Sequence, residues 1–197
     1  MDALTRCFIG IRAPNEVQEK LAAIQLDIKR RGGSDAVKWS SKDELHLTLC
    51  FLGELRVEQL SNVQRELDGF SLRFPAMELQ VGGLSGFPNG TQPKVIAANV
   101  TGSGSALVTL QSELARALEP FVTHRENKAF TPHITLGRVR TDSDQARTGM
   151  GRALRLVQTG IIGPWLATQF ELMRSAVGPT GPTYATIQGY SLRTQEA

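Results

Sequence analysis

The sequence predicts an α+β fold whose strands pair mainly antiparallel. Short segments in which apolar residues alternate with a period of two are interspersed with longer segments of helical spacing, which indicates both kinds of element. Several strand-like segments also follow one another with no helix between them, and this order favours antiparallel pairing over a doubly wound parallel sheet. A chain of 197 residues is long for one compact domain and short for two independent ones. We therefore expect a single domain over residues 1–197, built from two closely packed lobes.

The N-terminal half is expected to contain three strands and two helices. Pro14 favours a helix start because its fixed backbone angle suits the first helical turn, whereas Gly32 and Gly33 favour a helix end. Between these signals, and again after the longest strand, apolar residues recur on one helical face. The expected elements are strands at 6–11, 37–39 and 46–52, and helices at 15–30 and 57–69.

The C-terminal half is expected to contain more strand than helix. Pro75 excludes a helix from its own segment, since proline cannot donate the backbone hydrogen bond that a helix interior needs. We interpret the glycine-rich residues 82–86 as a turn or hinge, residues 140–151 as a polar loop and residues 158–164 as a turn that leads into the next strand. The other expected elements are extended segments at 72–84 and 94–100, a helix at 105–119, and strands at 133–139, 165–177 and 183–192.

The composition excludes several classes of protein. Hydrophobic residues make up 41% and charged residues 21% of the chain, which is typical of a globular protein and not of a disordered one. The N-terminus has an acidic residue at position 2 and no long apolar stretch, so it resembles neither a signal peptide nor a transit peptide. No segment has the run of about 18 apolar residues that a membrane span needs. Cys7 and Cys50 lie in apolar alternating segments, where we expect free thiols. These features predict a soluble cytoplasmic protein.

Net charge and common nucleotide motifs leave the binding partner open. The formal net charge is +3, which permits an anionic partner such as nucleic acid without requiring one. The sequence has no GxGxxG or GxxxxGK[ST] motif at a strand-to-helix junction and no GxSxG motif. It therefore offers no support for a dinucleotide site, a P-loop or a hydrolase of the nucleophilic-serine type.

Two short motifs carry the clearest chemical signal. Residues 46–49 read HLTL and residues 133–136 read HITL. Because side chains alternate between the two faces of a strand, each motif presents one imidazole and one hydroxyl on one face and two aliphatic side chains on the other. Chance is a poor explanation, since two of the three histidines in the chain carry the pattern. A duplicated packing unit without chemistry is the alternative.

Paired histidines suit acid and base catalysis on a phosphate ester. An imidazole has a pKa of about 6.5, so one histidine can activate a nucleophile while the other protonates the leaving oxygen. The hydroxyl groups of Thr48 and Thr135 can donate hydrogen bonds to phosphoryl oxygens. Zinc binding is the rival use of two histidines, but it takes three or four protein ligands with suitable spacing, and no HExxH pattern occurs. We expect neither a metal nor a cofactor.

The two motifs resemble those of the two-histidine (2H) phosphoesterase superfamily, and their surroundings resemble its bacterial RNA 2′,3′-cyclic phosphodiesterase branch, also called 2′-5′ RNA ligase. The supporting stretches, which cover nearly the whole chain, are RCFIGIRAP, VKW, ELHLTLCFLGEL, GGLSGFP, FTPHITLGR, FELMRSAV and YATIQGYSL. The resemblance implies a bilobal fold in which two pseudo-symmetric antiparallel sheets, flanked by helices, form a central groove and each present one HxTx motif. It also implies metal-independent hydrolysis of RNA 2′,3′-cyclic phosphate ends to 2′-phosphomonoesters.

The same resemblance implies catalytic roles for four residues. It makes His46 the proton donor and His133 the proton acceptor, with Thr48 and Thr135 beside them. The residues themselves leave this direction open, because the two motifs are nearly identical. Thr131 stands where the family often has arginine, and Tyr190 stands where it commonly has tryptophan.

Three further residues are implied to bind the substrate. Phe51 and Arg138, each five residues after a motif histidine, are expected to hold the terminal base, and Lys128 is expected to meet the RNA backbone. An odd spacing would place the first two on the buried face of their strands, so each strand has to bulge, twist or end first. A core aromatic is the alternative for Phe51, and a solvated surface side chain is the alternative for Lys128. His124, which has no threonine two residues later, is expected to be a surface residue.

Two other functions remain open at this point. One is reversible 2′-5′ RNA ligation as the main activity, and the other is a non-catalytic RNA-binding module. The expected partners are RNA or nucleotide ends that carry a 2′,3′-cyclic phosphate. We expect a monomer with no membrane association.

Overall fold

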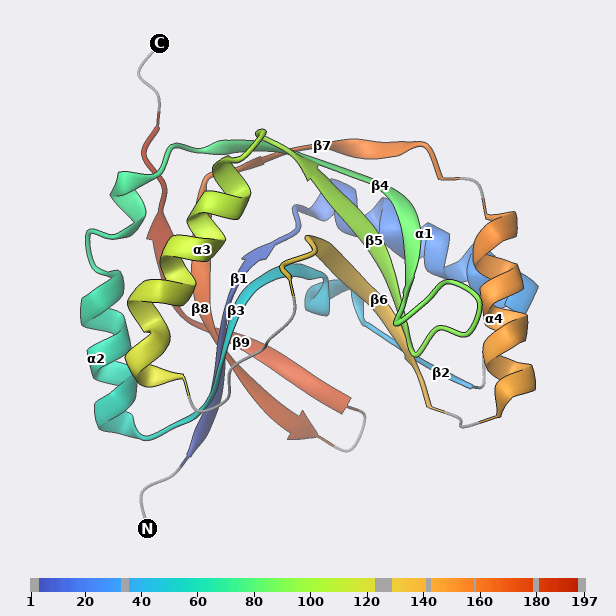
Figure 1. Ribbon diagram of the computed structural model, residues 1–197, viewed down its shortest axis with the longest axis horizontal. Helices are drawn as coiled ribbons and strands as arrows, with labels where there is room; N and C mark the ends of the chain where they lie inside the picture. Colours follow the sequence, from blue (N-terminus) through green and yellow to red (C-terminus); the bar gives the residue numbers. More distant parts are fainter. Residues whose placement is uncertain are drawn as a thin grey trace.

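The computed structural model describes residues 4–32, 36–122, 129–140, 143–157, 159–178 and 181–194. Within these residues it contains four α-helices and one nine-stranded sheet (Figure 1). The strands are β1 (Thr5–Arg12), β2 (Val37–Trp39), β3 (His46–Leu55), β4 (Met77–Phe87), β5 (Val95–Gly102), β6 (His133–Val139), β7 (Ile161–Ala167), β8 (Gln169–Gly178) and β9 (Gly181–Ser191), and the helices are α1 (Asn15–Gly32), α2 (Val57–Leu67), α3 (Ala106–Leu118) and α4 (Asp144–Leu156). These strands pair antiparallel throughout, which confirms the predicted α+β fold.

The sheet consists of two lobes joined at its centre. Its strands lie in the order β7-β4-β5-β6-β3-β1-β8-β9, with β2 paired to β6. The register between β3 and β6 contains one residue pair, Leu47 with Ile134. On one side of this pair lie β3, β1, β8 and β9, and on the other lie β6, β5, β4 and β7. These two groups correspond to the two expected antiparallel sheets, although their backbones connect into one.

Each lobe is covered by two helices that come from different parts of the chain. α2 and α3 lie against the lobe that contains β3, and α1 and α4 lie against the lobe that contains β4 and β7 (Figure 1). In sequence, α1 follows β1 of the first lobe and α3 follows β5 of the second. The chain therefore crosses repeatedly from one lobe to the other.

The apolar halves of the two motifs lie in the core. Leu47, Leu49, Ile134 and Leu136 are all buried, as the alternation predicts. α3 also buries one apolar face, through Leu107, Leu110, Leu114 and Leu118. Burying one such side chain contributes about 1.5–3 kcal/mol, so the aliphatic residues hold each motif firmly against the helices while its polar residues point the other way.

The prediction of a polar loop at 140–151 was wrong, because α4 occupies most of this segment. The side chain of Ser143 accepts a hydrogen bond from the backbone of Ala146 and so caps the first turn. The helix then buries Met150 and packs on α1. Two glycines and several charged residues hid this helix in the sequence, since glycine has a low helix propensity. Gly151 is needed for packing, because a Cβ there would collide with the backbone oxygens of residues 90 and 91.

The single strand predicted at 165–177 is two strands in the structure. β7 already begins at Ile161, inside the segment expected to be a turn, and ends at Ala167. After Thr168 the chain continues as β8, which pairs with β1 in the other lobe and not with β4. Pro164 fits within β7 because this strand lies at the edge of the sheet and pairs on one side. The turn signal of proline was thus misleading.

The glycine-rich residues 82–86 are also not a turn. They belong to β4, where the register against both neighbouring strands shifts next to Val81. Gly83 has a φ of 70°, which favours glycine and is typical of an irregular strand. Among the described helices, none is both long and apolar enough to cross a membrane.

Candidate active site

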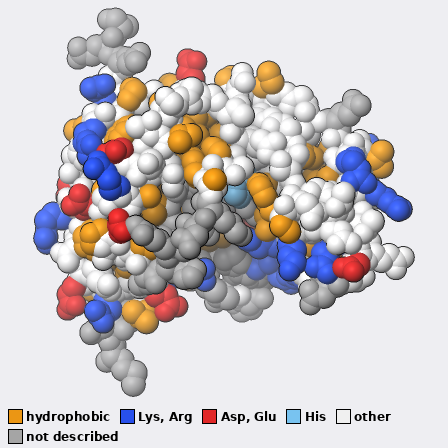
Figure 2. Space-filling view, viewed as in Figure 1, with side chains coloured by type: hydrophobic (Ala, Val, Ile, Leu, Met, Phe, Trp, Pro, Cys, Tyr) orange, Lys and Arg blue, Asp and Glu red, His pale blue; other side chains and the backbone are white. Residues whose placement is uncertain are grey.

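The central strands bring the two HxTx motifs side by side. Leu47 of β3 pairs with Ile134 of β6, and continuing this antiparallel register by one residue places His46 opposite Thr135 and Thr48 opposite His133. Directly opposite side chains share a face and have Cβ atoms about 4.5–5.5 Å apart. We call the face that carries these four polar residues the histidine face. Figure 2 shows a histidine ring set back between hydrophobic side chains near the centre of the molecule.

Both imidazoles are held in the same orientation by the backbone. Nδ1 of His46 lies 2.7 Å from the carbonyl oxygen of Glu44, and Nδ1 of His133 lies 2.7 Å from the carbonyl oxygen of Thr131. A carbonyl can only accept, so each Nδ1 carries a proton and donates it. In both motifs the acceptor is the residue two positions before the histidine. This leaves Nε2 of each ring as the nitrogen available for proton transfer.

Thr48 contacts the available nitrogen of its own motif. Its Oγ1 lies 3.1 Å from Nε2 of His46. When the imidazole is neutral with its proton on Nδ1, the threonine hydroxyl donates to Nε2. A protonated ring would instead donate to the hydroxyl oxygen, which frees the hydroxyl proton for another acceptor. The threonine can therefore follow the protonation state of its histidine.

Aromatic side chains from β1 and β9 enclose His46. The ring of Phe8 lies 4.8 Å from the imidazole between centroids, and Tyr184 packs edge-on against it at 5.0 Å. Gly10 leaves the space that the imidazole occupies, because a Cβ there would lie 3.2 Å from His46 Cδ2 and 3.0 Å from the Leu47 oxygen. His46 is therefore tightly packed on three sides.

This packing changes the acidity of His46. Burial lowers its pKa to about 4, and the positive charge of Arg12 and the electrostatic interaction with His133 act in the same direction. The hydrogen bond to the Glu44 carbonyl and the negative charge of Glu171 oppose the shift. His46 is thus neutral at pH 7 in the free protein, with Nε2 unprotonated.

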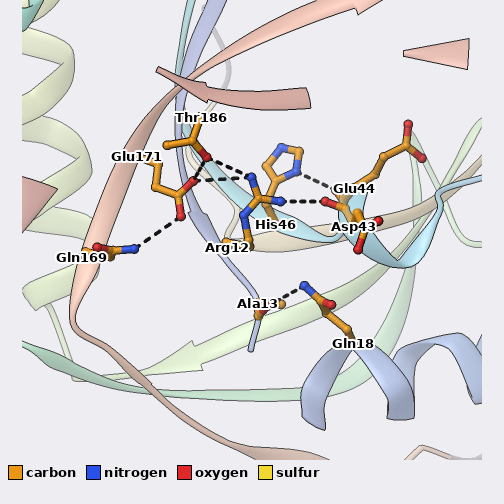
Figure 3. Close-up of polar contacts among 9 residues, drawn as sticks. All are labelled: Arg12, Ala13, Gln18, Asp43, Glu44, His46, Gln169, Glu171 and Thr186. Atoms are coloured by element: carbon orange, nitrogen blue, oxygen red, sulfur yellow. Dashed lines mark hydrogen bonds and ion pairs between the residues drawn. The ribbon is translucent and has the colours of Figure 1, made fainter. Parts of the chain in front are cut away.

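Arg12 lies opposite His46 in the pairing of β1 with β3 and organises a partly buried polar network (Figure 3). One of its terminal nitrogens donates to the Asp43 carbonyl at 2.8 Å, and the other reaches Glu171 at 3.4 Å and the Thr186 hydroxyl at 3.2 Å. The Thr186 hydroxyl also donates to Glu171 at 2.5 Å. Glu171 is only 5% exposed, so its charge requires these partners. The network holds the backbone at Asp43 in place. The next residue, Glu44, supplies the carbonyl that orients His46.

The surroundings of His133 repeat this arrangement with different chemistry. Asn99 of β5 lies opposite His133, as Arg12 lies opposite His46. The same sequence offset separates the two histidines and the two residues that face them. The ring of Phe87 lies 5.0 Å from the His133 ring. The lobes are therefore related by an internal pseudo-symmetry that is kept in the backbone but broken in the side chains around each histidine.

A bulge in β3 places Phe51 on the histidine face. The register of β3 against β1 shifts after Thr48, so that Leu49 is an extra residue on β3. Such a bulge reverses the alternation of side chains. Phe51 consequently pairs with Phe8, at 6.1 Å between ring centroids, and is 40% exposed. The alternative of an ordinary core aromatic is wrong.

An equivalent bulge in β6 does the same for Arg138. The register of β6 against β5 shifts after Thr135, which makes Leu136 the extra residue. Arg138 then pairs with Val95 of β5 and is exposed. Since both bulges follow the threonine of a motif, the odd spacing of Phe51 and Arg138 brings both side chains back to the histidine face.

The structure does not place every residue that was singled out from the sequence on the histidine face. Lys128 and His124 are outside the described residues. Tyr190 is buried and stacks on Phe170 at 5.4 Å, away from the histidine face. Within the part of the chain that the structure describes, no group of three or more His, Cys, Asp or Glu side chains is placed to hold a metal ion.

Sequence reasoning missed the residues that surround His46. Arg12, Glu171, Thr186 and Tyr184 come from β1, β8 and β9, which are distant from the motif in sequence. No periodicity or motif marks them, because their contact with His46 depends on the order of strands in the sheet. The sequence offers one signal. Arg12 and Asn99 are separated by the same number of residues as His46 and His133, so they occupy equivalent positions in the two halves of the chain.

Comparison with protein families identifies relatives of this chain. Residues 11–97, which contain the first HxTx motif, match the family model of LigT-like phosphoesterases. A protein of Thermotoga maritima named RNA 2′,3′-cyclic phosphodiesterase is 29% identical over 184 residues, which cover 92% of each chain. The protein of the same name from Archaeoglobus fulgidus is 27% identical over 183 residues, or 93% of this chain and 98% of that one.

Solved structures share the fold along the whole chain. A crystal structure of a Thermus thermophilus protein superimposes with a TM-score of 0.79 and 26% identity, covering 97% of this chain and 100% of that one. The structure of Escherichia coli LigT in complex with 3′-AMP gives a TM-score of 0.76 and 21% identity, covering 96% and 99% of the two chains. The second similarity concerns the fold alone.

Proposed function

We propose that this chain hydrolyses RNA 2′,3′-cyclic phosphate ends to 2′-phosphomonoesters, because residues 11–97 match the LigT-like phosphoesterase model and relatives named for that activity align with more than 90% of the chain. One observation carries the proposal: both imidazoles use Nδ1 to bind a backbone carbonyl, which leaves two Nε2 atoms on one face of the sheet. Two positioned proton-transfer groups, one for the nucleophile and one for the leaving group, are what hydrolysis of a phosphodiester requires.

In the proposed reaction, water attacks phosphorus and the bond to the 3′ oxygen breaks. Nε2 of His133 takes a proton from the attacking water as the new bond between oxygen and phosphorus forms. Nε2 of His46 donates a proton to the departing 3′ oxygen, so that the products are a 2′-phosphomonoester and a free 3′ hydroxyl. Thr48 and Thr135 donate hydrogen bonds to the non-bridging oxygens, where the negative charge concentrates.

The acidity of His46 bears on this direction. At a pKa of about 4, the ring is not protonated at pH 7 in the free protein, so it cannot donate a proton before the substrate binds. An anionic cyclic phosphate within hydrogen-bonding distance favours the imidazolium form and raises the pKa. Substrate binding therefore loads the proposed acid with its proton, and the histidine remains neutral otherwise.

The proposed contacts to the terminal nucleotide come from the two bulges. Phe51 and Arg138 offer an aromatic face and a guanidinium plane, both of which stack on nucleobases. Their positions on the histidine face support this role. A contact between Lys128 and the RNA backbone, a monomeric state and a cytoplasmic location stay predictions from the sequence.

Phosphorus NMR of the products tests the proposal directly. An oligoribonucleotide with a 2′,3′-cyclic phosphate end is incubated with the protein in the presence of EDTA. We expect a 2′-phosphomonoester signal, and we expect His46→Ala and His133→Ala each to lower the rate by at least about 100-fold. Absence of turnover by the wild-type protein, or a 3′-phosphate product, overturns the proposal. A new 2′-5′ linkage with an added 5′-hydroxyl strand would identify ligation, and binding without turnover would identify the RNA-binding alternative.

A further inference from the structure

Two positively charged residues face each other at one end of the histidine face. Lys38 of β2 pairs directly with Arg138 of β6, so their side chains share a face and their Cβ atoms are about 4.5–5.5 Å apart. Like charges placed opposite one another destabilise a sheet. β2 is only three residues long, so this repulsion is concentrated on a small element.

No acidic side chain compensates this pair within the described residues. Seven other Lys and Arg residues form ion pairs, among them Arg12 with Glu171 and Lys20 with Glu16. Lys38 and Arg138 have no such partner in the described part of the chain, and the neighbour of Arg138 on its other side is the apolar Val95. In Figure 2 a group of Lys and Arg side chains lies below and to the right of the visible histidine. A negatively charged group placed between these two cations would reduce their repulsion.

Lys38 and Arg138 lie close to the proposed reaction centre. Arg138 is three residues beyond Thr135 on the same strand, which corresponds to roughly 10 Å in extended chain. The bulge at Leu136 turns its side chain to the histidine face, and the register then turns Lys38 to that face as well. If the cyclic phosphate lies at the histidines and the terminal base stacks on the guanidinium plane of Arg138, the edge of that guanidinium and the Lys38 ammonium are left to face the preceding phosphodiester.

We propose that Lys38, together with Arg138, binds the phosphodiester group that joins the terminal nucleotide of the RNA to the nucleotide before it. This inference rests on the proposed function and names its substrate class: oligoribonucleotide ends in preference to free mononucleotide 2′,3′-cyclic phosphates. A single phosphodiester carries one negative charge and neutralises the repulsion between the two cations. A charge-assisted contact of this kind strengthens binding and makes it sensitive to salt.

Lys38 is well suited to a test because the fold does not depend on its charge. Its neighbours Val37 and Trp39 pack against the core, and the backbone of β2 supplies the pairing with β6. The side chain of Lys38 is only partly buried. Replacement by alanine removes the charge and leaves these contacts in place.

The experiment compares two substrates and three proteins. The substrates are adenosine 2′,3′-cyclic phosphate and a tetra-adenylate that ends in a 2′,3′-cyclic phosphate. Lys38→Ala is expected to lower kcat/KM for the tetranucleotide about tenfold more than for the mononucleotide, and to reduce the salt slope of kcat/KM for the tetranucleotide by about 0.7. Lys20→Ala, which removes an equal charge on α1, is the control. It should leave the ratio of kcat/KM between the two substrates, and the salt slope for the tetranucleotide, as in the wild type. If Lys38→Ala does not fold, Lys38→Gln keeps most of the aliphatic stem and replaces it.

The outcomes separate the inference from the proposed function. Equal loss on both substrates, or no loss on either, overturns the phosphodiester site while turnover by the wild type still supports the function. If the wild type turns over neither substrate, the proposed function fails, and fluorescence anisotropy with the labelled tetranucleotide then tests the site alone. Salt-sensitive binding that weakens about tenfold in Lys38→Ala supports the site, and unchanged binding overturns it.

Discussion

Leu47 and Ile134 form the one backbone-paired contact between β3 and β6, and both side chains are fully buried. Each sits between the histidine and the threonine of its motif. The spatial relation between the two imidazoles therefore depends on an apolar pair that points away from them. The two lobes meet at this pair. It therefore sets the distance between His46 and His133, which in the proposed reaction act on the same phosphate.

Leu47→Ala tests this dependence. The substitution should lower the free energy of unfolding by about 2–5 kcal/mol, as core truncations do, and should also lower kcat in the protein that remains folded, because β3 is no longer seated against β6. Leu114→Ala is the control, since Leu114 is equally buried on α3 away from the seam. Urea unfolding and turnover at low temperature measure both effects. An equal kcat in the two variants would contradict the prediction.

The pKa of His46 predicts a specific dependence of stability on pH. Its pKa is about 6.5 when unfolded and about 4 in the folded protein, so between these values the unfolded chain binds a proton that the native chain does not. Stability therefore rises with pH in this window and is lost as the pH falls. From pH 7 to pH 5 the wild-type free energy of unfolding should drop by about 2 kcal/mol more than that of His46→Gln. The free energy of unfolding is measured against pH by urea unfolding. If it changes equally in the wild type and His46→Gln, the pKa of His46 is not lowered by folding.

The charges of the Arg12 network should move the pKa of His46 in opposite directions. The guanidinium of Arg12 lowers the pKa and the carboxylate of Glu171 raises it. We therefore expect Arg12→Gln to raise the pKa of His46 and Glu171→Gln to lower it. NMR titration of the imidazole resonances measures both. Shifts of the same sign would mean that the substitutions act by loosening the packing around the ring and not through charge.

A substrate with sulfur in place of the 3′ oxygen tests which histidine is the acid. A thiolate is a better leaving group than an alkoxide and needs little protonation, so loss of the acid matters less. His46→Ala should therefore be impaired by about 100-fold or more on the oxygen substrate but at least tenfold less on the sulfur substrate. His133→Ala should be impaired similarly on both. The reverse pattern in kcat/KM would make His133 the acid.

Tyr190→Phe should stabilise the protein. The Tyr190 hydroxyl is buried with no hydrogen-bond partner among the described residues, and burial raises the pKa of this phenol to about 12. Removing an unpartnered buried hydroxyl recovers its desolvation cost while the ring keeps its stack on Phe170, so we expect a gain of about 1 kcal/mol. Urea unfolding at neutral pH measures it. A loss of stability would show that the hydroxyl has a partner.

Much of the fold was predictable because it depends on local patterns. Alternation gave the strands at both motifs, and helical spacing gave α1, α2 and α3. The errors have a common cause. α4, the start of β7 and the irregular part of β4 all contain glycine or proline, whose local preferences were overcome by tertiary contacts such as the packing of α4 on α1.

The sequence by itself determined which residues of each motif share a face, since that follows from the geometry of a strand. The pairs His46 with Thr48 and His133 with Thr135 therefore follow from local spacing alone. Tertiary structure decided the rest. The bulges that turn Phe51 and Arg138 to the histidine face arise from pairing with β1 and β5, and the pKa of His46 arises from burial beneath distant strands. Register and burial join residues that are far apart in the chain, so no local pattern can encode them.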